Sequence, residues 1–127
     1  MGRVRDEPRR GPPPESFLPL TPATFQILLA LVDAERHGYG IMQEVAARTE
    51  GAVRLGPGTL YGSLKRLLQV GLIEEGDERA DAALGDERRR YYGMTEYGRR
   101  VTRAEARRLE AAVASARRKR LIGLELT

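Results

Sequence analysis

The segment that most constrains the fold is GPGTLYGSLKRLLQVGLIEEG, residues 56–76. Four leucines recur in it with helical spacing: Leu60, Leu64, Leu67 and Leu68. The spacing i, i+4, i+7, i+8 places one clean apolar face on a helix over 57–70. Tyr61, Lys65 and Arg66 are left for the polar face, which contains no acidic residue. The segment therefore predicts a helix that leucines hold in its domain and that offers an acid-free face to a partner.

The residues before this segment predict two further helices. Thr21 suits an N-cap, and Pro22 suits the first helical position, where its missing N–H costs nothing. Four apolar residues then follow the helical i, i+3, i+4, i+7 pattern: Phe25, Leu28, Leu29 and Val32. This helix is expected to end near 35–37. A shorter helix is expected over about 40–49, and AVRL, 52–55, is the candidate for a short strand.

The residues after the segment predict a hairpin and a long helix. LIEEG (72–76) and RRRYYGM (88–94) have the composition of strands, and the polar stretch 77–87 connects them. Thr95 is placed to cap a helix that reaches about Arg120. Small and apolar residues repeat along it with 3-4-3 spacing: Ala106, Leu109, Val113 and Ala116. This heptad-like seam is typical of a helix that docks on another helix.

The order of these elements predicts the fold class. It is mainly α with a minor β part, a winged helix-turn-helix with a long C-terminal dimerisation helix. In that architecture the third helix enters the DNA major groove. We expect a disordered N-terminal arm over 1–19, a winged-helix DNA-binding domain over 20–94, a dimerisation helix over 95–122 and a tail over 123–127. The arm is assigned on its Pro, Gly and charge content, which cannot bury enough apolar surface to order it.

Charge and composition narrow the classes of function. The formal net charge is +4, and the charges fall in blocks along the chain rather than alternating in sign. Residues 57–70 contain no acid, 71–87 are strongly acidic and 88–120 are strongly basic. Such blocks favour a polyanionic partner over a merely solvated surface. No apolar run approaches the roughly 20 residues of a membrane span, so we expect a cytoplasmic protein with no membrane partner.

Neither an enzyme nor a metal site is indicated. The chain has no cysteine and a single histidine, which gives no nucleophile–base pair and no zinc ligand set. GPGTLYGS superficially resembles a phosphate-binding loop, but its second glycine falls one place late and Ser63 stands where that loop has lysine. We therefore predict no catalytic activity, no metal and no cofactor. His37 is more consistent with the end of a helix than with a ligand.

Four stretches in the same order and spacing resemble the PadR-like family of bacterial transcriptional regulators. They are LTPATFQILLAL, HGYGIMQEV, GPGTLYGSLKRLLQVGLI and YYGMTEYGRRV, and together they cover about 18–120. The resemblance implies a winged-helix homodimer, joined through its C-terminal helix, that represses transcription at a near-palindromic operator. It also implies a bacterial, nucleoid-associated protein of the short form with one C-terminal helix. Some relatives in that family sense small aromatic molecules, but nothing in this sequence identifies an effector.

Two departures from the family pattern bear on the DNA contacts. Gly56 stands where the family commonly has a hydroxyl residue before the recognition helix, and glycine is a weaker N-cap. The hairpin tip is also longer and more acidic than the usual basic wing, since it carries Asp77, Asp81 and Asp86. These carboxylates would repel phosphates, so we expect the tip to stay away from the DNA backbone.

The candidate DNA-binding residues lie at the start of the second helix, on the third helix and on the second hairpin strand. They are Tyr39, Pro57, Gly58, Thr59, Tyr61, Gly62, Ser63, Lys65, Arg66, Arg88, Arg89 and Arg90. A helix N-terminus favours phosphate, tyrosine can contact phosphate or a thymine methyl, and lysine can reach phosphate or guanine. The alternatives are an ordinary solvated face for 57–70 and an aromatic plug over the core for Tyr39.

The candidate dimer interface combines the seam with the first helix. It consists of Phe25, Leu28, Leu29, Ala106, Leu109, Val113 and Ala116. The predicted partners are thus double-stranded DNA and a second copy of the chain. The alternative is a winged helix that mediates protein contacts without specific DNA binding, and the acid-free face around Lys65 argues against it. Binding to random duplex DNA and its salt dependence distinguish the two.

Overall fold

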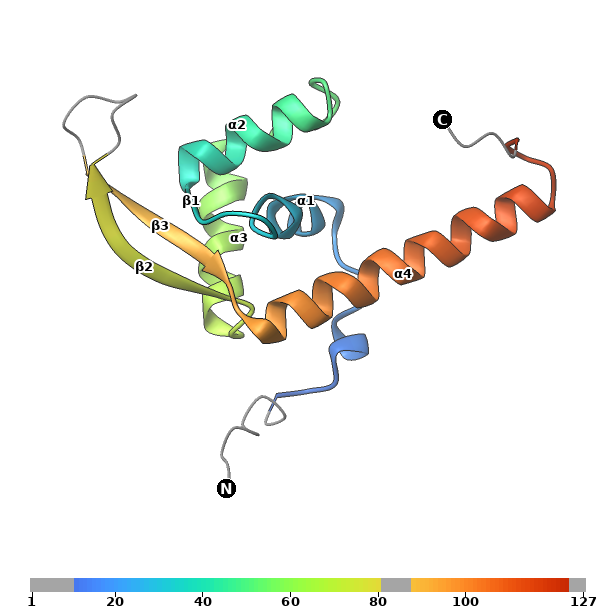
Figure 1. Ribbon diagram of the computed structural model, residues 1–127, viewed down its shortest axis with the longest axis horizontal. Coiled ribbons are helices and arrows are strands. Elements are labelled where there is room, and N and C mark those ends of the chain that lie inside the picture. Colours follow the sequence, from blue (N-terminus) through green and yellow to red (C-terminus); the bar gives the residue numbers. More distant parts are fainter. Residues whose placement is uncertain (1–10, 81–87, 124–127) are drawn as a thin grey trace.

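A computed structural model describes residues 11–80 and 88–123 of the chain, and Figure 1 shows the arrangement of its elements. In chain order these are a 3-10 helix and a succession of helices and strands: η2 (Pro14–Phe17), α1 (Pro22–Ala30), β1 (Arg36–His37), α2 (Gly38–Arg48), α3 (Pro57–Gln69), β2 (Ile73–Ala80), β3 (Arg88–Met94) and α4 (Glu96–Arg118). The helices and the hairpin expected from the sequence are present, but β2 runs to Ala80, through residues 77–80 that we expected in the polar connection. The structure confirms a mainly α winged helix-turn-helix.

Helix α1 begins as predicted but ends earlier. The Thr21 side chain accepts a hydrogen bond from the backbone N–H of Thr24 at 3.1 Å, which confirms the N-cap. The helix was expected to reach residues 35–37, but its last residue is Ala30. Arg36 Nε donates to the Ala30 carbonyl oxygen at 2.7 Å, so a side chain from the following strand satisfies one of the carbonyls that the helix end leaves open.

The sheet has three antiparallel strands in the order β1-β3-β2. Its first strand is the pair Arg36–His37, which lies opposite Tyr92 and Tyr91 of β3. We expected the short strand at 52–55 instead, and that expectation is wrong. There the Val53 N–H donates to the Thr49 hydroxyl oxygen at 3.0 Å, so a side chain rather than a neighbouring strand satisfies this backbone group.

The core lies where α1, α2 and α3 meet the base of the hairpin and the first turns of α4. Its fully buried side chains come from all of these elements: Ile27, Leu28, Ile41, Val45, Leu60, Leu64, Leu72 and Val101. Leu60, Leu64 and Leu67 are 0–4% exposed, which confirms that the leucine stripe of α3 faces the domain. Each such leucine stabilises the fold by about 1.5–3 kcal/mol relative to an exposed one.

Helix α4 packs tightly at its beginning and projects at its end. The Thr95 side chain accepts from the Gly98 N–H at 2.9 Å, as an N-cap does, and donates to the Gly71 carbonyl at 2.7 Å. Gly98 lies so close to the Leu72 carbonyl that a Cβ there would collide with it. In Figure 1 the second half of α4 extends away from the winged domain, on the side opposite the hairpin.

Residues 11–20, the N-terminal strap, lie along the beginning of α4. The Tyr97 hydroxyl donates to the Pro12 carbonyl at 2.7 Å, and the Phe17 and Tyr97 rings meet edge to face at 5.8 Å. We predicted disorder over 1–19, whereas 11–19 contain η2 and are packed in this way. Residues 1–10 of that arm lie outside the described residues. In the described part of the chain, no helix has the length and apolar character needed to cross a membrane.

Candidate nucleic-acid interface

The outer face of α3 is exposed and carries no acid along the whole described helix. Pro57, Gly58, Thr59, Gly62 and Lys65 are exposed there, and Tyr61 is 49% exposed. Gly56 precedes the helix without a side-chain cap, so the first backbone N–H groups of α3 have no capping side chain. An uncapped helix start favours an anion, and the acid-free face that follows it therefore suits contact with phosphate.

Gly58 and Gly62 stand on this face with open space above them. A Cβ built on either residue would meet no described atom within 4 Å. Packing within the described chain therefore does not require glycine at these two positions, although glycine within a helix costs about 1 kcal/mol relative to alanine. A partner that approaches α3 closely would account for that cost.

Tyr61 links α3 to the beginning of α2. Its phenol ring lies against Gly38, where a Cβ would collide with the Tyr61 ring and hydroxyl. The two helices thus meet with Tyr61 lying across the first residue of α2. Gly38 was not among the predicted site residues, and the glycines on both sides of Tyr39 in HGYG were the signal that pointed to such a close approach.

An open hollow of about 380 Å³ lies between α2, α3 and β3. It is lined by residues from all three elements and by His37 before α2: His37, Gly38, Tyr39, Met42, Pro57, Tyr61, Arg89, Arg90 and Tyr92. Five predicted DNA-binding residues therefore meet in one place. Tyr39 is 47% exposed, so its side chain does not serve as a plug over the core.

His37 has a structural role in this hollow. Its Nδ1 accepts from the Gly40 N–H at 2.9 Å, so it caps α2, and its ring meets Tyr91 edge to face at 5.2 Å. The sequence placed His37 at the end of the first helix, but α1 ends at Ala30 and His37 instead caps the beginning of the second. Among the described residues no group of three His, Cys, Asp or Glu side chains is placed to hold a metal.

The structure separates some predicted site residues from this face. Ser63 is only 6% exposed because its side chain turns into the domain, and it is not available to DNA. Arg66 lines a separate hollow of about 210 Å³ with Phe17, Leu20 and other residues near the beginning of α1. The side chain of Arg88 lies outside the described residues, as do Asp81 and Asp86 of the hairpin tip.

Arg90 is held within the hairpin. Its guanidinium donates to the Glu75 carboxylate at 2.7 Å and to Glu78 at 3.2 Å. These bonds, that to Glu75 first, raise the pKa of the Arg90 guanidinium above its ordinary value. The positive charge of Arg90 is therefore offset by two carboxylates, and its attraction for phosphate is weaker than the sequence suggested.

Of the residues predicted for the dimer interface, one is buried within its own chain and the others are half-buried or exposed. Leu28 is 0% exposed within its own chain, so it cannot contact a partner. Phe25 and Leu29 of α1 are half-buried. On α4, Leu109 is 36% exposed and Val113 is 41% exposed. Ala106 is exposed as well, and Ala116 is half-buried.

A three-helix unit, an antiparallel hairpin and an exposed third helix together define a winged helix-turn-helix protein. The sequence profile of the transcriptional regulator PadR-like family matches residues 27–104. The chain belongs to this family of transcriptional regulators. That agrees with the sequence analysis, which assigned no catalytic activity.

Solved structures of other regulators share the fold. A transcriptional regulator from Clostridium thermocellum superposes with a TM-score of 0.62 at 22% identity, over 75% of this chain and 89% of that chain. A Streptococcus transcriptional regulator gives 0.63 at 17% identity, over 77% and 91%. Bacillus subtilis PadR, in complex with operator DNA, gives 0.55 at 20% identity, over 65% and 46%.

A curated relative is an uncharacterized 37.1 kDa protein in transposon TN4556 of Streptomyces fradiae. It is 36% identical over 84 residues, which are 66% of this chain but 22% of the relative. The chain thus matches only about a fifth of that protein.

Proposed function

We infer that the protein is a sequence-specific DNA-binding repressor that acts as a homodimer on an inverted-repeat operator in the bacterial nucleoid. One observation carries this proposal. The exposed face of α3 combines Lys65, no acid, and two glycines above which no described atom lies within 4 Å. Bacillus subtilis PadR, which shares the fold, is in complex with operator DNA. Family membership and fold thus favour DNA as the partner of this face.

The proposed contacts divide between backbone and bases. Lys65 and the first N–H groups of α3 face phosphate or guanine, and Tyr61 reaches a phosphate or a thymine methyl. Tyr39 and Arg89 line the same hollow and are proposed to contact the DNA backbone beside it. We favour a phosphate contact for Lys65, because an ammonium is a point charge without the bidentate fork of arginine.

The proposed dimer forms through the projecting half of α4. Ala106, Leu109 and Val113 are exposed on that half, which Figure 1 shows extending beyond the winged domain. A second copy would cover this seam, with Phe25 and Leu29 as neighbouring contacts. Two-fold symmetry then requires an inverted repeat, with half-sites about 34 Å apart in successive major grooves.

Selection of tight-binding fragments from random and genomic duplexes, followed by fluorescence anisotropy, tests the specificity. We expect an inverted repeat that binds two chains per duplex and is preferred about a thousandfold over random DNA. One chain per duplex, or equal affinity for selected and random DNA, would contradict the proposal. The second result would favour a winged helix that contacts proteins instead.

Sedimentation equilibrium tests the dimer separately. The wild type should be dimeric at micromolar concentration, and Leu109→Glu should shift it toward monomer by placing a charge in the seam. Ala111→Glu is the matched control, because Ala111 is exposed on a different side of the same helix. A monomeric wild type, or equal effects of the two substitutions, would exclude this interface.

A further inference from the structure

An open groove of about 520 Å³ lies between the N-terminal strap and α4. The strap contributes Pro14, Glu15 and Leu18, and α4 contributes Ala104 and four arginines. The volume is within the range of small-molecule sites in proteins. Neither α3 nor the hairpin lines this groove, so it is separate from the proposed DNA-binding face.

The strap is fixed against α4 on both sides of η2. Before η2, the Tyr97 hydroxyl holds the Pro12 carbonyl at 2.7 Å. After η2, the Leu20 N–H donates to the Glu105 carboxylate. The bond to Arg108 is the main cause that lowers the pKa of Glu105, and the bond from Leu20 adds to it. The walls of the groove are therefore set by specific contacts and do not need a ligand to form.

The arginines of the groove differ in how they are satisfied. Arg108 is neutralised, since its Nε and Nη2 donate to the two oxygens of Glu105, both at 2.8 Å. Arg100, Arg103 and Arg107 make no hydrogen bond or ion pair with any described residue, and the Nε of Arg100 is buried without a partner. Three guanidinium charges thus face the groove, and Glu15 supplies the one carboxylate among the described residues that line it.

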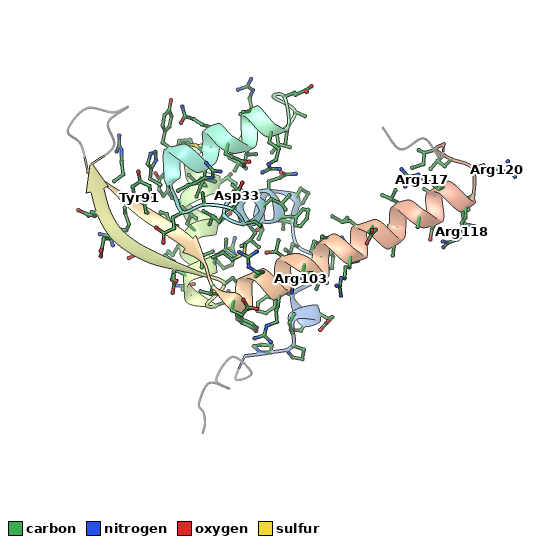
Figure 2. The ribbon with its side chains drawn as sticks, viewed as in Figure 1. Asp33, Tyr91, Arg103, Arg117, Arg118 and Arg120 are labelled. Atoms are coloured by element: carbon green, nitrogen blue, oxygen red, sulfur yellow. The ribbon has the colours of Figure 1, made fainter. Side chains whose placement is uncertain are left out.

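These three arginines are spaced i, i+3 and i+7, so they lie along one side of α4. Figure 2 shows Arg103 on the packed part of the helix, well apart from Arg117, Arg118 and Arg120 at its far end. Arg100 and Leu109 are nine residues apart, or about two and a half helical turns, and therefore lie on opposite sides of α4. The groove stays open in the proposed dimer, and the inference does not depend on that dimer.

We propose that this groove binds a small phosphate ester with an apolar or aromatic body. A phosphate monoester carries about two negative charges and three acceptor oxygens, which suit several guanidinium forks at once. Leu18, Pro14 and Ala104 supply apolar surface beside the charges, and this surface would cover the ester's organic part. A ligand held between the strap and α4 would stiffen the segment that leads into the N-cap of α1.

Isothermal titration calorimetry on the full-length protein at fixed ionic strength tests the ligand class. The probes are AMP, adenosine and inorganic pyrophosphate. AMP should bind saturably and perturb backbone amide signals of 14–18 and 100–107, while adenosine should not bind and pyrophosphate should compete more weakly. Binding of adenosine as tight as AMP, binding of pyrophosphate as tight as AMP, or no saturable AMP binding below about 1 mM would each overturn the proposal.

Matched variants locate the binding. Arg103→Gln with Arg107→Gln should weaken AMP binding at least about tenfold, because two charge-assisted contacts are lost. Arg118→Gln with Lys119→Gln removes the same charge from the end of α4 and should leave AMP binding unchanged. Glu15→Gln should tighten it by removing the carboxylate at the edge of the groove.

Equal losses in the two double variants would reduce the effect to general charge attraction and refute the site. Loss of random-duplex affinity in the Arg103→Gln, Arg107→Gln variant as large as its loss of AMP affinity would make the groove a DNA contact instead. Circular dichroism of each variant checks the fold. The Glu15→Gln variant keeps the proposal falsifiable if the arginine variant unfolds, since unchanged or weaker AMP binding there would count against it.

Discussion

Helix α3 and the β2–β3 hairpin, the wing, both carry cations near one hollow, but they hold them differently. Lys65 on α3 is exposed and makes no ion pair with any described residue. Arg90 on the wing is bonded to both Glu75 and Glu78. The number of arginines in a strand therefore does not measure the positive charge available to DNA, because ion pairs within the fold offset part of that charge.

The difference follows from the sheet register. Glu75 lies opposite Tyr92, Glu78 lies opposite Arg90, and the pairing is irregular between Glu75 and Glu78. The irregularity brings both carboxylates within reach of one guanidinium. On α3, by contrast, no acid occurs at any position of the helix, so no local partner competes with phosphate for Lys65.

The largest effect is expected when the space above α3 is filled. Gly62→Leu should lower operator affinity about a hundredfold by holding the helix away from the groove. The substitution should not destabilise the fold, because no described atom lies within 4 Å of the new Cβ and leucine is the better helix former. Fluorescence anisotropy and thermal unfolding measure the two effects.

Gln69→Leu is the matched control, since it adds the same side chain to an exposed position in the last turn of α3. It should change operator affinity far less than Gly62→Leu. Unchanged affinity in Gly62→Leu would mean that no partner approaches α3 closely at this position.

Removal of the buried charge of Glu105 should lower the stability of the fold without changing DNA binding. Glu105 is bonded to Arg108, its side chain is 3% exposed, and this bond is the main reason that the pKa of Glu105 lies below its ordinary value. Glu105→Gln should cost about 1–2 kcal/mol in the free energy of unfolding at neutral pH. It should leave the DNA affinity of the folded protein unchanged, whereas Lys65→Ala should weaken DNA binding and leave the free energy of unfolding unchanged.

The contribution of Glu105 to the stability of the fold should decrease as the pH falls. Because the folded-state pKa of Glu105 is depressed, its contribution is fully present above the unfolded pKa of about 4.3. It is lost as pH falls through the lower folded pKa. Denaturant unfolding of wild type and Glu105→Gln should therefore converge in acid, with exposed Glu110→Gln as the control. A gap that widens in acid would contradict this assignment.

The smallest effect is expected when the charge of Arg90 is released. Glu75→Gln with Glu78→Gln removes the two carboxylates that hold it and should tighten binding to random duplex severalfold at low salt. Glu74→Gln with Asp77→Gln removes the same charge without touching the Arg90 pairs and is the control. If both double variants tighten binding equally, the pairing of Arg90 does not limit the affinity of the wing for DNA.

Sequence periodicity predicted the elements whose signals are long. The leucine stripe of α3, the hairpin strands and the caps at Thr21 and Thr95 were all identified from local patterns. Strand β1 was missed because two residues have no periodicity, and its existence depends on pairing with Tyr91 and Tyr92 far along the chain. The end of α1 was misplaced because the apolar pattern continues to Val32, whereas the helix ends at Ala30.

The site was predictable in outline but not in detail. Tyr39, Tyr61 and Lys65 are exposed as expected, since their positions follow from the helical pattern. The burial of Ser63 and Leu28 depends on how neighbouring helices pack. The ion pairs of Arg90 depend on Glu75 and Glu78, which are 15 and 12 residues away. The order of the strap depends on Tyr97, which is 85 residues from Pro12. The composition of the strap alone cannot predict that contact.

Salt titration of DNA binding by the wild type, Lys65→Ala and Arg90→Ala compares the charge that α3 and the wing offer to DNA. With operator and random duplexes, we expect Lys65→Ala to weaken binding and to lower the slope of log K against log salt by about one. A loss of about 1–3 kcal/mol confined to one operator position would instead assign Lys65 to a base. Arg90→Ala should change the slope by clearly less than one. Equal binding of wild type and Lys65→Ala to both duplexes, with the fold intact, would remove α3 from the interface and contradict the account.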